Sequence, residues 1–129
     1  MLRIIRGESL SSDTAQTGGM RRSAAISGDL CGARALWMGR TVVPAGTSSG
    51  DHHHGDSETG IYVVSGNPVF VFRDPASGEL VRLETGPGDY VWVPPQVPHR
   101  EENPSLDTEA VVVIARSTQE AIVVNVPEL

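Results

Sequence analysis

From residue 33 onward, short apolar runs alternate with turn-forming residues. The runs are rich in β-branched and aromatic residues, as in the segments 61–64 and 69–72, and Gly, Pro, Asn or Asp follows each of them closely. Short runs bounded in this way are typical of β-strands. The pattern predicts strands at 33–43, 58–65, 69–73, 79–84, 90–93, 108–116 and 121–126.

The same pattern contains no convincing helical period, so we expect an all-β protein. Regularly spaced short strands occur in sandwiches and in barrels, and periodicity alone does not separate the two. The 129 residues are the usual size of one domain. We expect a barrel domain at 33–129, preceded by an irregular arm at 1–32 that holds one short strand at 24–26.

Composition and charge narrow the range of partners. The formal net charge is −6, and no basic run is longer than Arg21-Arg22, which argues against nucleic acid as a partner. No apolar stretch approaches the roughly 20 residues of a membrane span. Cys31 is the only cysteine and cannot form an intrachain disulfide, so we expect a cytoplasmic protein.

The histidines carry the chemistry that the sequence suggests. Three are consecutive, His52-His53-His54, Glu58 follows them, and His99 lies 45 residues beyond His54. In an extended chain alternate side chains share a face, so His52 and His54 point to one side and His53 to the other. A shift of one residue would turn His53 inward instead. Three imidazoles and one carboxylate suit one divalent transition-metal ion such as Mn, Fe, Co, Ni or Zn.

Two segments resemble the paired motifs of the cupin family. The first motif is usually written G-x5-HxH-x3,4-E-x6-G, and the matching segment here is Gly46-x5-His52-x-His54-x3-Glu58-x7-Gly66. The second is G-x5-P-x-G-x2-H-x3-N, matched by Gly88-x5-Pro94-x-Gln96-x2-His99-x3-Asn103. Two positions depart from the pattern. The spacing after Glu58 is one residue long, compensating for a short spacing before it, and Gln96 replaces a glycine.

The resemblance implies a double-stranded β-helix, the cupin jelly-roll barrel, with the metal inside. In cupins the residues that match His52, His54, Glu58 and His99 bind the metal. The resemblance also implies a homodimer, because cupin barrels often pair through outer strands or N-terminal segments.

The resemblance leaves the activity open. A metal-dependent enzyme of dioxygenase, lyase, decarboxylase or isomerase type is one expectation, in which Glu58 accepts a proton and Tyr62 donates a hydrogen bond to an oxyanion. The alternative expectation for Tyr62 is a purely structural role in the packed core. The alternatives are a binding or sensing module without catalysis and a metal-free cupin that uses its histidines as acid and base. An inward-facing Arg34 or Arg40 would bind a substrate carboxylate, whereas an outward-facing one is a solvated surface residue.

Overall fold

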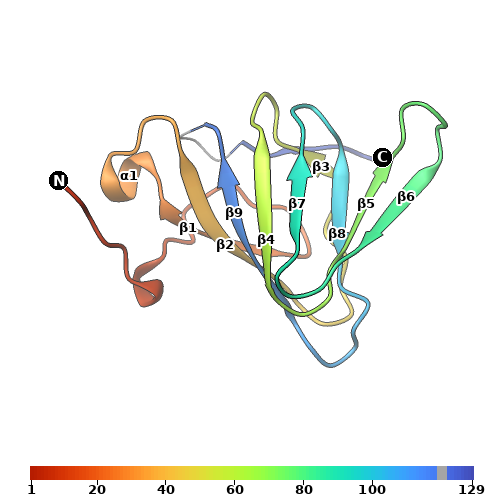
Figure 1. The fold of residues 1–129 in the computed structure, drawn as a ribbon, viewed down its shortest axis with the longest axis horizontal. Helices are drawn as coiled ribbons and strands as arrows, with labels where there is room; N and C mark the ends of the chain where they lie inside the picture. The colour runs from red at the N-terminus through yellow and green to blue at the C-terminus, as the bar shows by residue number, and fades with distance from the viewer. Residues whose placement is uncertain (119–121) are drawn as a thin grey trace.

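The computed structural model describes residues 1–118 and 122–129, and its strands form two five-stranded sheets (Figure 1). The first sheet has the strand order β1-β2-β9-β4-β7. Its strands are β1 (Arg21–Ile26), β2 (Trp37–Val43), β9 (Ala110–Arg116), β4 (Thr59–Ser65) and β7 (Tyr90–Val93). All neighbouring pairs in this sheet are antiparallel.

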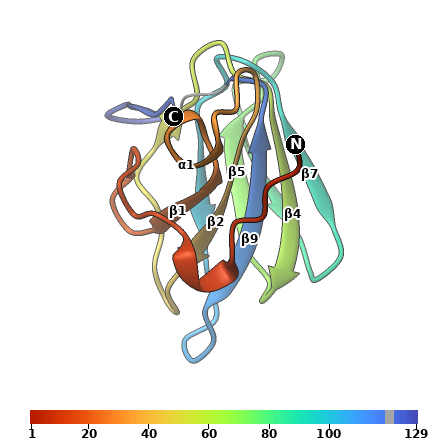
Figure 2. The same ribbon diagram turned by 90° about the vertical axis from the view of Figure 1, so that its left-hand side faces the viewer.

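The second sheet has the order β10-β3-β8-β5-β6 and is also antiparallel. Its strands are β10 (Val124–Asn125), β3 (His52–His53), β8 (His99–Glu102), β5 (Val69–Arg73) and β6 (Leu80–Glu84). The chain passes repeatedly between the sheets, which curve around a common interior (Figure 2). This is the jelly-roll β-barrel that the two motifs predict.

Strands bounded by strong turn signals lie where the sequence predicts them. The bounds of β5 and β7 agree with the predicted ranges, since Gly, Pro and Asp fix both ends. The predicted irregular arm at 1–32 is wrong in part, because β1 pairs with β2 along its length. The arm also contains a 3₁₀ turn, Gly7–Ser9, and a short helix α1, Gly28–Cys31. Of the predicted strand at 121–126 only β10 forms, and residue 121 lies outside the described residues.

Inward-facing residues of both sheets form the core. The strand β9 alternates strictly, so that Ala110, Val112, Ile114 and Arg116 are buried while their neighbours are more exposed. Burying a side chain such as Ile114 contributes roughly 1.5 to 3 kcal/mol. The main apolar cluster lies between the sheets and comprises Ala24, Trp37, Ile61, Val63, Phe70, Val93, Val112 and Ile114. Buried polar residues share the interior with this cluster.

The motif turns adopt left-handed backbone conformations. Gly66 has a φ of 79°, and a Cβ there would lie 2.8 Å from Cα of Ala110. Gln96, which replaces the second motif's glycine, has a φ of 65°. Its side chain donates a 2.7 Å hydrogen bond to Asp56 and its backbone N–H donates to Gly55. These bonds offset the cost of a left-handed non-glycine residue, so the turn before His99 is retained.

Among the described residues, no helix has the length and apolar character needed to cross a membrane.

Candidate metal centre

Three histidines converge inside the barrel from the second sheet. His52 lies on β3 directly opposite His99 on β8, and His54 follows one residue after β3 ends. All three side chains are buried, and their potential ligand atoms lie within 4.8 Å of one another. The ring centroids are 4.5 Å apart for His52 and His99, and 5.0 to 5.1 Å apart for the other two pairs. The predicted convergence of these residues is therefore found, and His53 lies outside the group.

Backbone carbonyls fix the orientation of each ring. Nδ1 of His52 lies 2.9 Å from the Gly50 oxygen, and Nδ1 of His99 lies 3.0 Å from the Val97 oxygen. Nδ1 of His54 lies 2.8 Å from the oxygen of Ile122. Because a carbonyl only accepts, each Nδ1 carries the proton and each Nε2 keeps its lone pair. An oriented Nδ1 is the usual partner arrangement of a metal-binding histidine.

Burial also keeps the three rings neutral. Burial, together with the neighbouring His99, lowers the pKa of His52 to about 3. Burial lowers the pKa of His54 to about 2, with a further contribution from Arg116. The pKa of His99 falls to about 4 for the same main reason, although its hydrogen bond to Val97 opposes the shift. All three Nε2 atoms are thus unprotonated at neutral pH.

The prediction that Glu58 joins these histidines is wrong. Glu58 is exposed and lies immediately before β4, whose inward positions are Thr59, Ile61 and Val63. The longer form of the motif, with four residues between His54 and the ligand and six before Gly66, places Thr59 at the glutamate position. Thr59 is fully buried, and its hydroxyl has no hydrogen-bond partner within the protein. The centre therefore consists of three histidines with a threonine in place of the carboxylate.

Tyr62 also faces away from the histidines. Its side chain is 38% exposed, and its ring lies 4.9 Å from that of Tyr90 on the outer face of the first sheet. Tyr62 lies four residues after Glu58 and faces the same side of the strand. One error of register in the prediction therefore placed both residues in the interior, whereas both face outward. A catalytic role for Tyr62 at the histidine centre is excluded by this placement.

The interior contains three buried charged residues that the sequence did not single out. Arg22 on β1, Glu101 on β8 and Arg116 on β9 are each about 1% exposed. The predicted candidates Arg34 and Arg40 are instead exposed. The sequence does offer one signal for Arg116. It alternates in step with the apolar Val112 and Ile114 on one strand, so it faces inward with them despite the usual preference of arginine for solvent.

These buried charges act on one another. Burial and, to a lesser extent, nearby Arg22 lower the pKa of Arg116 to about 9, although Glu101 opposes both effects. Burial raises the pKa of Glu101, and both arginines oppose that shift. Arg116 also lies over the ring of Trp37, with its guanidinium carbon 4.7 Å from the ring centroid. Arg116 remains a cation at neutral pH.

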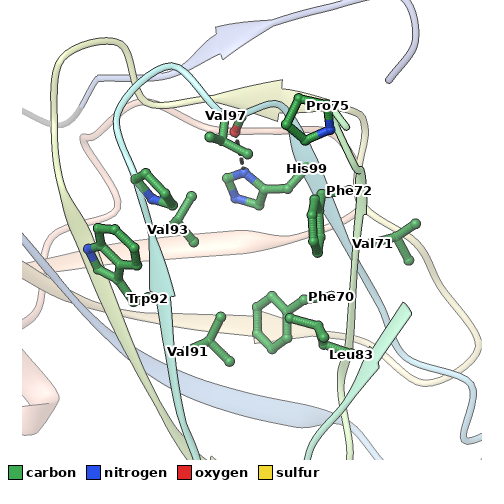
Figure 3. A pocket seen from close by; sticks show the side chains of 11 residues that line it. Phe70, Val71, Phe72, Pro75, Leu83, Val91, Trp92, Val93, Val97 and His99 are labelled. Carbon is green, nitrogen blue, oxygen red and sulfur yellow. Dashed lines mark hydrogen bonds between the residues drawn. The ribbon is translucent and has the colours of Figure 1, made fainter. Parts of the chain in front are cut away.

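An apolar cavity of about 330 Å³ leads toward His99 from between β7 and β5 (Figure 3). Its walls include Phe70 and Phe72 on one side and Val91 and Val93 on the other. His99 is the only charged or titratable residue that lines it among the described residues. A small molecule entering here would meet an apolar wall first and the histidine centre at the end.

The donor set fits a divalent transition metal. Neutral imidazole nitrogens bind Zn, Fe, Co, Ni and Mn, and three protein ligands leave positions for a substrate or water. Nε2 of His99 is buried and has no hydrogen-bond partner within the protein, as expected of a nitrogen placed for a metal. Without a carboxylate ligand, the three histidines leave the full charge of the ion uncompensated.

The fold and the site define a jelly-roll protein of the cupin class. Residues 39–115 match the family model Cupin_2, described as a cupin domain. The match covers more than half of the chain, so the protein belongs to the cupin family.

Solved structures support the fold across most of the chain. Peruvianin-I, a cysteine peptidase from Thevetia peruviana latex, aligns with a TM-score of 0.79 at 17% identity, covering 98% of this chain and 78% of that one. The polyketide cyclase RemF from Streptomyces resistomycificus gives 0.74 at 19% identity, covering 98% and 86%. Bacillus subtilis oxalate decarboxylase, a protein with Mn(II) centres, gives 0.75 at 18%, but this chain spans only 30% of its length. No curated protein matches the sequence.

Proposed function

We propose that this chain is a metal-dependent cupin that acts on a small organic molecule, with one divalent transition metal held by His52, His54 and His99. The observation that carries the proposal is the convergence of three buried Nε2 atoms whose rings are each oriented by a backbone carbonyl. The ion belongs to the group Mn, Fe, Co, Ni and Zn. It would supply Lewis-acid polarisation of a substrate oxygen or a site for dioxygen.

The protein's own residues bind and orient the substrate. The apolar walls around Phe70, Phe72 and Val93 exclude water from the approach to His99. The hydroxyl of Thr59 and the guanidinium of Arg116 have polar atoms without partners inside the same interior, so both are available to hydrogen-bond a substrate. The reaction is of dioxygenase, lyase, decarboxylase or isomerase type, the classes compatible with a substrate bound through oxygen.

Elemental analysis of protein purified without a His-tag tests the metal. We expect one metal ion per chain, lost in His54→Ala and retained in His53→Ala. His53 is the matched control because its Nδ1 accepts a hydrogen bond from the Gly55 N–H and lies outside the cluster. A metal-free wild-type protein whose activity survives His52→Ala would contradict the proposal and support the metal-free cupin.

Turnover separates an enzyme from a binding or sensing module. The metal-loaded protein is incubated with pooled small metabolites, and the masses are followed over time. Depletion of one compound with appearance of a matching product supports the enzyme. Stoichiometric retention of a compound without a product supports a non-catalytic module.

We also propose a cytoplasmic homodimer. Tyr90 and Trp92 are 80% and 65% exposed and lie beside Tyr62 on the outer face of the first sheet. An exposed apolar patch of this kind is typical of an interface between copies of a chain. Light scattering at micromolar concentration is expected to give twice the mass of one chain, and Trp92→Glu is expected to halve it. A monomeric wild-type protein would refute the dimer.

A further inference from the structure

The barrel interior holds more positive charge than its own residues balance. Arg22 and Arg116 are both buried cations, whereas Glu101 is the only buried carboxylate among the described residues. Two buried guanidinium groups thus face one buried carboxylate, which leaves one positive charge unbalanced among these three residues. An uncompensated buried charge is costly, and an anion would relieve that cost.

Arg116 is the cation that lacks partners. Its Nε, Nη1 and Nη2 atoms are all buried, and none has a hydrogen-bond partner within the protein. Arg22 differs, because its terminal nitrogens contact Thr17, Met20 and His52. A guanidinium with every donor free presents the planar fork that binds a carboxylate through two parallel hydrogen bonds. Its position over Trp37 holds the plane of the fork in place.

The strand register connects Arg116 with the apolar cavity. Arg116 on β9 is directly opposite Thr59 on β4, and Thr59 is directly opposite Val93 on β7. All three side chains point inward, and Val93 lines the cavity that ends at His99. Neighbouring strands are about 4.8 Å apart, so the backbones of Val93 and Arg116 are roughly 10 Å apart across the sheet. Thr59 therefore lies between the cavity wall and Arg116 on the inner face of this sheet.

We infer that Arg116 forms a carboxylate-binding subsite next to the histidine centre, and that the natural ligand is a small organic acid whose apolar body occupies the cavity bounded by Phe70, Phe72 and Val93. Thr59 donates a second hydrogen bond to the same ligand. The inference rests on the proposed small-molecule function and narrows its substrate to amphiphilic carboxylates.

Calorimetric titration with matched acid and amide pairs tests the subsite. The probes are acetate with acetamide, butyrate with butyramide, and phenylpropionate with phenylpropionamide. Each acid should bind at least tenfold more tightly than its amide, since hydrogen bonds to a charged group contribute a factor of about ten or more. Affinity among the acids should rise with the size of the apolar body. Equal affinity of acid and amide, or no binding of any acid at millimolar concentration, would overturn the inference.

Variants identify the residue responsible. Arg116→Gln should weaken phenylpropionate binding at least tenfold and leave the amide unchanged. Arg116→Lys should recover part of the loss, because it keeps the charge without the fork. Arg40→Gln is the control, since Arg40 lies on the same sheet but is exposed. Unchanged acid affinity in Arg116→Gln would refute the assignment, and if that variant does not fold, Arg116→Lys and the wild-type acid–amide ratio decide.

A second readout separates binding from a purely structural role. Because its donors are unpaired, Arg116→Gln should melt at or above the wild-type temperature without ligand. A fall of several degrees would show that Arg116 serves the fold instead. Titrations of metal-loaded and metal-free protein distinguish the two proposals. An Arg116-dependent acid preference without stoichiometric metal contradicts only the metal centre, and stoichiometric metal without acid preference contradicts only the subsite.

Discussion

Arg22 donates a hydrogen bond from Nη2 to Nε2 of His52 across 3.2 Å, so a cation occupies the lone pair that a metal would use. Nδ1 of His52 is already bound to the Gly50 oxygen, which leaves Nε2 as the acceptor. Metal binding therefore requires the Arg22 head group to move away from His52. The contact of Arg22 with His52 thus joins the outermost strand of the first sheet, β1, to the histidine centre.

This contact predicts that Arg22→Met tightens metal binding. Loss of a competing donor and of a like charge should lower the Kd for Ni²⁺ or Zn²⁺ on the order of tenfold. Competition with a chromophoric chelator measures the change. Arg21→Met is the control because Arg21 is exposed on the same strand. An unchanged or higher Kd in Arg22→Met would contradict the competition.

Position 59 holds a threonine where the motif has a glutamate, so introducing a glutamate there should change metal affinity. Thr59→Glu should tighten metal binding on the order of tenfold or more, because it adds an anionic ligand to three neutral ones. It should also weaken phenylpropionate binding, since the new carboxylate lies beside Arg116. Glu58→Gln should change neither property, as Glu58 is exposed. Loss of metal in Glu58→Gln would instead show that Glu58 is a metal ligand.

Metal removal should lower thermal stability. A metal present at a hundred times its Kd stabilises the folded state by about 2.7 kcal/mol. For a domain of this size that corresponds to a fall in Tm of about 10 °C when the metal is chelated. Differential scanning calorimetry before and after chelation measures it. His54→Ala should show no such difference. An unchanged Tm of the wild-type protein after chelation would contradict a bound ion.

The close approach at Gly66 predicts a cost for its replacement. Gly66→Ala places a Cβ 2.8 Å from Cα of Ala110 in a left-handed conformation, and should destabilise the fold by about 2 to 3 kcal/mol. Gly60→Ala on β4, the strand that ends just before Gly66, is the control, because nothing lies within 4 Å of the added carbon. Urea unfolding compares them. Equal stability of the two variants would mean that the turn at Gly66 relaxes freely.

A surface ion network predicts a small dependence on pH. Burial raises the pKa of Glu102, but hydrogen bonds from Arg100 and Arg82 outweigh it, so the net shift is downward. A lowered carboxyl pKa stabilises the fold above pH 4.5, and that contribution is lost as the pH falls through the folded-state value. Glu102→Gln should cost about 0.5 kcal/mol at pH 7 in urea unfolding, and the cost should shrink as the pH falls below 4.5. A cost that does not change with pH would assign the effect to packing.

Much of the fold was predictable from turn chemistry. Strands such as β5 and β7 are bounded by Gly, Pro and Asp, so local sequence defines both ends. Only the second half of the strand β1, at 24–26, was predicted. Its first half consists of two arginines and a serine, and tertiary pairing with β2 overrides that polarity. The three histidines were found because ligand spacing within a motif is a local property.

The rest of the site depended on register and on burial. Glu58 was preferred for its chemistry, although Thr59 has the motif spacing, and a shift of one residue moves a side chain to the other face of a strand. Arg22 and Arg116 were missed because arginine is rarely buried fully. Whether an inward arginine is paired depends on side chains from distant strands, and that information is absent from any local pattern.

The histidines come from the second sheet, and Arg22, Thr59 and Arg116 come from the first. Since main-chain carbonyls hold Nδ1 of each ring, the orientation of the three histidines does not depend on the side chains of the first sheet. Exchanging residues of the first sheet would thus change which compounds are accepted and how tightly an ion is held, while the three histidines keep their orientation. Such a separation makes the scaffold easy to adapt, by evolution or by design, to new chemistry.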